Sequence, residues 1–248
     1  MLFYAKSPVF YSVVFCEKKR YRATISYEGK TMAKFSTILF DLDGTITDPK
    51  NGITKSVAYA LDYFHIPYPS LDSLCTFIGP PLRDSFSEYG VKESDLKLAI
   101  EKYREYYIQE NGIFDLTIYP GFMDMLKKLK QAEKKIFLAT CKTRIYANDI
   151  LEHFSLAPYF DFVSGSELDG TRITKGEVIA YALAETKTQA SEQVIMVGDR
   201  KHDILGAKEN SLQVASVLYG YGTREEFLAH HTDFIVETVK DLEQFLLQ

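Results

Sequence analysis

The sequence predicts an α/β protein with a doubly wound, mostly parallel sheet and an inserted α-helical domain. Short apolar runs alternate with helical patterns along most of the chain, which is typical of parallel strands joined by crossover helices. Residues 51–116 break this alternation, because they show helical spacing of apolar residues and no convincing strand. We therefore expect an α/β core at residues 34–50 and 117–248 and a helical insertion at 51–116.

The apolar runs mark the expected strands. The first, residues 35–40, is short, as expected for a strand buried on both faces, and it ends at Asp41. Further strands are expected at residues 135–139, 160–163, 194–197 and 214–218, with 234–236 as an edge strand. Helices are expected at residues 121–132, 143–154, 175–186, 202–210, 224–230 and 238–247.

Within the insertion, apolar residues recur at helical spacing from Ile53 to Phe64 and from Leu96 to Tyr107. A turn at Gly79-Pro80-Pro81 separates these two stretches. The aromatic residues near the end of the second stretch could belong to the core of the insertion or to an interface between molecules. The sequence leaves the oligomeric state open between a monomer and a homodimer.

Composition excludes several classes of partner. A net charge of −5 argues against a nucleic acid polymer, because phosphate backbones are bound by clustered Lys and Arg. No apolar run is long enough to span a bilayer, so we expect no membrane partner. The three cysteines are widely spaced, which argues against a disulfide framework or a zinc site and favours the reducing cytoplasm.

Residues 1–33 form an N-terminal extension that differs from the rest of the chain. The first 31 residues contain six Lys or Arg and two Glu, so they carry +4 of the formal charge and the remainder carries −9. We expect this extension to be poorly ordered. We also hypothesise that translation naturally starts at Met32, because Glu28-Gly29-Lys30 can be encoded by a purine-rich run resembling a ribosome-binding site.

Two pairs of carboxylates follow two of the expected strands. Asp41 and Asp43 begin the segment Asp-Leu-Asp-Gly-Thr after the first strand, and Asp199 and Asp203 follow the strand at 194–197. Ligands of doubly wound sheets bind beyond the carboxyl ends of strands. Carboxylate oxygens suit Mg²⁺ as ligands. Four carboxylates brought close together would repel one another strongly without a cation. Thr45 offers a hydroxyl and a backbone amide to a phosphate.

Rival interpretations of these acidic segments are weaker. An EF-hand calcium loop starting at Asp41 requires Gly at its sixth position and Glu at its twelfth, where this chain has Ile46 and Gly52. A polar turn that only ends a strand stays open for either pair taken alone. A dinucleotide-binding loop fails at Gly220-Tyr221-Gly222, which lacks the third glycine and follows a late strand.

Two further segments could bind a phosphate. Thr140 ends the strand at 135–139 and is followed by Cys141 and Lys142, so its hydroxyl and the nearby ammonium could contact phosphate oxygens. Cys141 cannot serve a Cys-x5-Arg thiol phosphatase because residue 147 is Ala, and we expect it to be buried and structural. Lys175, at a helix start, could neutralise anionic groups at the site, although a lysine there is often simply solvated.

Together, these segments resemble the phosphatase branch of the haloacid dehalogenase superfamily over about residues 35–248. The nearest similarity is to phosphoglycolate phosphatase-like proteins and related 5′-nucleotidases. The segments that carry the resemblance are residues 40–45, 78–82, 197–203 and 218–222. The loop Thr140-Cys141-Lys142-Thr143 departs from the family's Thr-Ser-Lys-Pro pattern. The resemblance implies a Rossmann-like core and an inserted helical cap that closes over the site.

The resemblance also implies an activity and a set of roles. The chain would be a Mg²⁺-dependent phosphatase acting on a small phosphorylated metabolite, phosphoglycolate-like, through a phospho-aspartate. Asp41 would be the nucleophile and Asp43 the general acid and base. Asp199 would bind Mg²⁺ beside the Asp41 carboxylate and the Asp43 backbone carbonyl, and Asp203 would hold metal-bound water or orient Lys175. The substrate would contact Thr45, Thr140, Cys141, Lys142, Lys175 and, at its distal end, Arg83, which could equally be an exposed cap residue.

The sequence leaves some other functions open and argues against others. Dehalogenases and Schiff-base phosphonatases lack the second carboxylate that Asp43 supplies. A 5′-nucleotidase or another phosphatase of the same superfamily is the first alternative. A phosphomutase like β-phosphoglucomutase uses the same pair of aspartates, and a non-enzymatic binding protein is the alternative from another class.

Overall fold

The computed structural model describes residues 35–110 and 112–248. The expectations for residues 1–33, including a natural start at Met32, fall outside the described residues. None of the helices in the described ranges is both long and apolar enough to cross a membrane.

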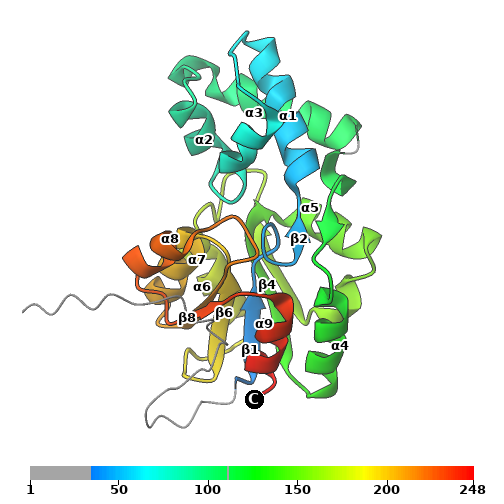
Figure 1. The fold of residues 1–248 in the computed structure, drawn as a ribbon, viewed down its shortest axis with the longest axis vertical. Coiled ribbons are helices and arrows are strands. Elements are labelled where there is room, and N and C mark those ends of the chain that lie inside the picture. The colour runs from blue at the N-terminus through cyan, green and yellow to red at the C-terminus, as the bar shows by residue number, and fades with distance from the viewer. Residues whose placement is uncertain (1–34, 111) are drawn as a thin grey trace, which may run out of the picture. The chain divides into compact units, whose positions relative to one another are not determined.

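Six parallel strands form the central sheet, in the order β5-β4-β1-β6-β7-β8 (Figure 1). Their bounds are β1 Thr37–Phe40, β4 Lys135–Thr143, β5 Phe162–Ser166, β6 Val194–Gly198, β7 Gln213–Val217 and β8 Phe234–Val236. Each expected strand is present, and the doubly wound sheet is confirmed. The order of the strands reverses between β1 and β6, which is where ligands of such sheets bind.

Helices cover both faces of this sheet. Successive residues of β1 belong to opposite apolar layers, because side chains alternate across a strand: Ile38 and Phe40 pack in one layer and Leu39 in the other. The first layer includes residues of α4 Phe122–Gln131, α5 Arg144–His153 and α9 Val239–Leu246. The second includes residues of α6 Lys175–Glu185, α7 Lys201–Glu209 and α8 Arg224–Ala229.

The insertion is helical, as expected. It contains α1 Lys50–Tyr63, α2 Leu82–Glu88 and α3 Leu96–Gln109, which lie together in Figure 1. Short 3-10 helices accompany them at Leu71–Phe77, Glu93–Asp95 and Gly112–Phe114, and another lies in the core at Ala157–Tyr159. A two-stranded antiparallel sheet, β2 Thr47–Asp48 with β3 Thr117–Ile118, joins the chain entering the insertion to the chain leaving it. The sequence did not predict this sheet, because two-residue strands leave no apolar periodicity.

Gly52 fixes the start of α1 against the end of the insertion. A Cβ built on Gly52 would lie 2.0 Å from the Gly112 carbonyl oxygen, and the Gly52 amide donates to Asp115 O at 2.9 Å. We expect Gly52→Ala to lower the free energy of unfolding by about 1–3 kcal/mol, because the close backbone approach must open. Urea denaturation measures this. The neighbouring exposed residue gives the control, Asn51→Ala, which should be neutral or slightly stabilising. An unchanged stability of Gly52→Ala would contradict the close approach.

Candidate active site

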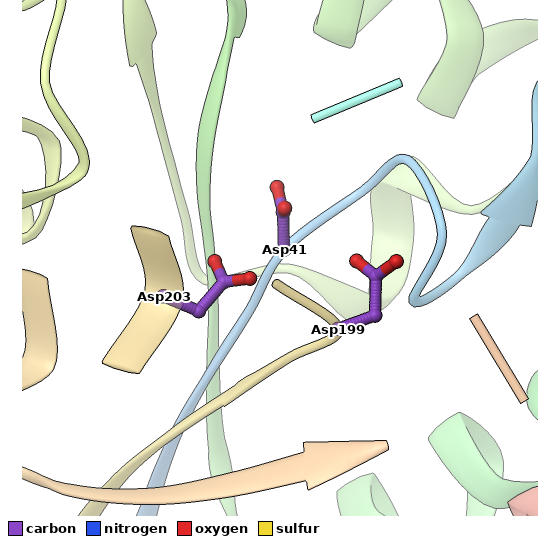
Figure 2. Close-up of side chains that lie close together, drawn as sticks. All are labelled: Asp41, Asp199 and Asp203. Atoms are coloured by element: carbon purple, nitrogen blue, oxygen red, sulfur yellow. The ribbon is translucent and has the colours of Figure 1, made fainter. Parts of the chain in front are cut away.

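Three carboxylates meet at the carboxyl edge of the sheet, where the strand order reverses. Asp41 directly follows β1, Asp199 directly follows β6, and Asp203 lies in the first turn of α7. One carboxylate oxygen from each lies within 4.8 Å of the others, and Figure 2 shows the three side chains converging. All three residues are buried. The structure therefore brings Asp41 together with two residues that follow it by 158 and 162 positions in the sequence.

Burial and mutual repulsion make this cluster electrostatically costly. Burial raises the pKa of Asp199 well above its ordinary value, and the neighbouring Asp203 and Asp41 raise it further. Burial, again with a contribution from Asp41, raises the pKa of Asp203 to about 6 although Lys175 opposes the shift. Both shifts show that a positive charge at this position would stabilise the ionised carboxylates.

Lys175 supplies part of that charge from inside the protein. Its Nζ lies 2.8 Å from Asp41 Oδ1, 2.8 Å from Asp203 Oδ1, and donates to Ala139 O at 3.0 Å. Burial alone would lower the pKa of Lys175, but Asp203 and Asp41 raise it overall. The side chain is only 4% exposed, so the alternative of a solvated lysine is wrong.

Local sequence explains where Lys175 sits. Thr174 is the N-cap of α6: its side chain accepts from the Glu177 amide at 3.3 Å, and the Glu177 side chain accepts from the Thr174 amide at 3.0 Å. This reciprocal capping box fixes the first residue of the helix. Lys175 is that residue, and its ammonium group reaches the site beside β4, where it donates to Ala139 O.

Asp43 is separate from the three-carboxylate cluster. Its Oδ2 lies 2.9 Å from Lys142 Nζ, and its Oδ1 accepts from the Thr47 hydroxyl at 3.4 Å. Burial raises the pKa of Asp43, while Lys142 opposes that shift. Lys142 Nζ also donates to the hydroxyl of Tyr107, on α3 of the insertion, at 2.6 Å. The side chains of only three of the four predicted carboxylates therefore converge, and the fourth is held by a lysine that also contacts the insertion.

The loop after β7 encloses Asp199, a feature that sequence reasoning did not use. The Tyr221 amide donates to Asp199 Oδ2 at 2.7 Å, and the Tyr221 hydroxyl donates to Asp48 in β2. A Cβ on Gly44, where φ is +83°, would lie 2.2 Å from Asp199 Oδ2, and a Cβ on Gly220 would lie 2.4 Å from Asp199 Cβ. Both glycines are thus required by close approach to the same side chain. The only signal in the sequence was the resemblance of residues 218–222.

For two residues of the expected substrate-binding set, the structure corrects one expectation each. Thr45 is fully buried, with its hydroxyl 3.4 Å from Asp199 Oδ1 and its amide donating to Leu42 O, so it supports Asp199 instead of lining the cavity. Cys141 is only partly buried and lines the cavity, which corrects the expectation of a buried structural residue. Burial nevertheless raises the pKa of the Cys141 thiol to about 12, so it stays protonated at neutral pH.

A cavity of about 330 Å³ adjoins the acidic residues. Asp41, Asp43, Thr140 and Lys142 line its inner end. Thr140 lies where the pairing of β4 with β5 becomes irregular, between Ala139 and Thr143. The insertion and the loop at residues 166–173 supply much of the remaining wall. This volume is at the low end of the range for small-molecule pockets, about 300–1,000 Å³.

The insertion contributes two arginines to this wall, of which the sequence predicted one. Arg83 lines the cavity but is exposed and forms an ion pair with Glu93. Arg104, on α3, also lines the cavity and was missed, because a single arginine on a helix carries no distinctive pattern. Tyr103 and Tyr107 on the same helix are buried and stacked on each other at 5.3 Å between ring centroids, so they belong to the wall and not to an exposed surface.

The donors at the cluster fit a divalent cation. Asp41, Asp199 and Asp203 are buried with one ammonium group, that of Lys175, which leaves a formal excess of two negative charges. Oxygen-only donors of this charge suit Mg²⁺ better than softer metals. Gly44 and Gly220 lie so close to Asp199 that no larger side chain fits at either position.

Comparisons with known proteins identify the family of this chain and several relatives. The family described as haloacid dehalogenase-like hydrolase matches residues 38–217. A 5′-nucleotidase from Pseudomonas aeruginosa is 38% identical over 214 residues, which cover 86% of this chain and 96% of that protein. The tyrosine-protein kinase PtkA from Mycobacterium tuberculosis is 33% identical over 84% of this chain and 72% of its own length. The crystal structure of a predicted phosphatase from Clostridium acetobutylicum superposes with a TM-score of 0.83 at 42% identity, covering 87% of this chain and 99% of that one.

Proposed function

Because the chain belongs to the haloacid dehalogenase-like hydrolase family, we propose that it is a Mg²⁺-dependent phosphatase of small phosphomonoesters that works through a phospho-aspartate on Asp41. One observation carries the proposal: Asp41 is held by Lys175 at the edge of a cavity that Asp43 also lines. This arrangement supports Asp41 as the nucleophile and Asp43 as a separate acid beside a space of small-molecule size.

The contacts of Asp41 favour attack by one of its oxygens. Lys175 and the Leu42 amide both contact Oδ1 of Asp41, at 2.8 and 2.7 Å. None of the described residues donates a hydrogen bond to its Oδ2. In the proposed reaction Oδ2 bonds to phosphorus and the bond from phosphorus to the leaving oxygen breaks. Lys175 holds the carboxylate in position and, with the Thr140 hydroxyl, would contact the phosphoryl oxygens.

Asp43 would move the proton in both halves of the reaction. Burial raises its pKa, which favours the protonated form that donates to the leaving oxygen. Once ionised, Asp43 would take a proton from the water that hydrolyses the acyl phosphate on Asp41. Lys142, 2.9 Å away, stabilises the ionised form between these two steps.

Residues that would hold Mg²⁺ are Asp41, Asp199 and the backbone carbonyl of Asp43, with Asp203 close by. The bound cation would offset the charge between an anionic nucleophile and an anionic phosphate. Asp199 is kept in the position that binding of the cation requires by its contacts with Tyr221 and Thr45 and by the close approach of Gly44 and Gly220.

The helical insertion, residues 51–116, would act as a cap that excludes water from the cavity. The contact between Lys142 and Tyr107 supports this role, because it joins the insertion to the acid at the inner end of the cavity. We place the enzyme in the cytoplasm. Cys75 and Cys141, the cysteines in the described ranges, are free thiols, as expected in a reducing compartment.

The leaving group is open between a small acid such as glycolate and a nucleoside. The Pseudomonas aeruginosa relative is named a 5′-nucleotidase, which favours the nucleoside, whereas the small cavity favours a short leaving group. A phosphomutase would isomerise a phosphosugar without releasing phosphate, and a binding protein would do neither.

Phosphate release from a panel of phosphomonoesters tests the proposal. We expect release that requires Mg²⁺ and stops in EDTA. In Asp199→Asn, the Mg²⁺ concentration for half-maximal rate should rise by about tenfold or more, because a charged donor is lost. Exposed Asp149 offers the control, since Asp149→Asn should leave this concentration unchanged. Release that persists in EDTA would contradict the role of the metal, and no release from any compound would contradict the phosphatase.

A further inference from the structure

Nearly every charged side chain that lines the cavity is neutralised by a neighbour. Asp41 is paired with Lys175 and Asp43 with Lys142. Glu167 is paired with both Arg144, at 2.8 Å, and Arg172. Arg83 is paired with Glu93. In the part of the chain that the structure describes, Arg104 is the remaining charged residue of the cavity wall, and it has no carboxylate partner or hydrogen bond.

Arg104 lies on the same helix as a residue that contacts the lysine paired with the candidate acid. It precedes Tyr107 by three residues on α3, so the two share one face of the helix and are separated by about 4.5 Å along its axis. Tyr107 contacts Lys142, and Lys142 contacts Asp43. Arg104 therefore lies on the same helix as the tyrosine that contacts the Lys142–Asp43 pair, on a cavity wall that the two stacked tyrosines make largely apolar.

We propose that Arg104 is a specificity-determining residue that binds a second anionic group on the leaving group of the substrate. The substrate class is then a small phosphomonoester whose leaving group ends in a carboxylate or a second phosphate. This inference rests on the proposed phosphatase reaction, which supplies the position of the first phosphate. A partly buried cation in a small cavity is costly without a counter-charge, and the described residues provide none.

Neighbouring features favour Arg104 over Arg83 for this task. The Arg83 side chain is 56% exposed and already bound to a carboxylate, so its charge is screened by water and by Glu93. Arg104 is only partly exposed and has no carboxylate partner among the residues that the structure describes. A planar guanidinium can bind either a carboxylate or a phosphate through two parallel hydrogen bonds.

Matched pairs of substrates test the inference. For a carboxylate, 3-phosphoglycerate is compared with glycerol 3-phosphate. For a second phosphate, 1,3-propanediol bisphosphate is compared with 3-hydroxypropyl phosphate. In the wild-type enzyme we expect kcat/KM to be about tenfold or more higher for the anionic member of at least one pair, mainly through KM, as expected for a charged hydrogen bond. The pair that shows the preference identifies the anion.

Four variants locate the origin of this preference. Arg104→Gln should abolish it, while rates with the neutral members change little, and Arg104→Lys should restore part of it because the charge returns. Lys97→Gln removes a positive charge from an exposed position of the same helix and should keep the preference. Arg83→Gln should also keep it. Loss of the preference in Arg83→Gln but not in Arg104→Gln would overturn the proposal, as would equal rates for both members of each pair.

A binding measurement separates this inference from the proposed function. Calorimetric titration of Asp41→Asn with each compound reports affinity without turnover. If the wild-type protein releases no phosphate but Asp41→Asn binds the anionic members more tightly, and Arg104→Gln in the same background removes the difference, the phosphatase fails and the anion subsite stands. If turnover occurs and neither rate nor affinity depends on the second anion, the subsite fails and the phosphatase stands.

Discussion

Replacing Asp41 with Asn is expected to lower kcat for phosphate release by at least about 10⁴-fold, the scale seen when an enzyme loses its nucleophile. The amide keeps the shape of the side chain but cannot form the acyl phosphate. Phosphate release under single-turnover conditions measures the loss, and mass spectrometry of the acid-quenched wild-type protein should find the added phosphoryl group on Asp41.

Stability has to be compared in parallel, because Asp41 is one of the two carboxylate partners that Lys175 has among the described residues. Circular dichroism and the denaturation midpoint of Asp41→Asn show whether the fold is retained. The exposed control Asp149→Asn should keep full activity. A folded Asp41→Asn protein with activity within tenfold of wild type would exclude the phospho-aspartate at this residue.

Replacing Lys175 with Met should destabilise the metal-free protein more than any other single change at the site. The variant leaves Asp41 and Asp203 buried without the cation that lies 2.8 Å from each. Breaking a buried ion pair by removing one partner costs about 3–5 kcal/mol. Urea denaturation in EDTA should show a loss of this size, and activity should vanish as well.

Mg²⁺ distinguishes the electrostatic cause from simple loss of packing. If uncompensated carboxylates destabilise Lys175→Met, added Mg²⁺ should restore part of the lost stability, because a cation held by the remaining carboxylates would stabilise the folded state. Loss of packing would not respond to the cation. The control Lys240→Met, at an exposed position of α9, should change stability by no more than about 0.5 kcal/mol. A loss below about 1 kcal/mol in Lys175→Met would contradict the buried ion pair.

Elements with strong periodicity were predictable from the sequence. The strands end within a few residues of the apolar runs, because a strand covered on both faces is apolar along its whole length, as Ile38, Leu39 and Phe40 are. Topology then explains the convergence of Asp41 and Asp199, since adjacent parallel strands end at the same edge of the sheet. The helical insertion followed from spacing alone.

Contacts between segments distant in sequence were not predictable in the same way. The isolated sequence motif suggested Thr45 as a phosphate ligand, but its hydroxyl faces Asp199 from another strand. Arg104 stands out only because the other charged residues around the cavity have partners of opposite charge. Those partners are distant in the sequence, so the sequence alone does not identify them. The two-residue strands β2 and β3 exist because they pair with each other across the ends of the insertion. Two residues are too few for a local sequence pattern to predict a strand.

Tyr221 uses two chemically different groups for its two contacts, the backbone amide for Asp199 and the side-chain hydroxyl for Asp48. Asp48 also accepts from the Lys50 amide at the start of α1. Any residue except proline supplies the amide, whereas only the phenol supplies the hydroxyl. Substitution at this position could therefore change how firmly the start of the insertion is held while leaving the contact with Asp199 unchanged, so that the two properties can evolve separately.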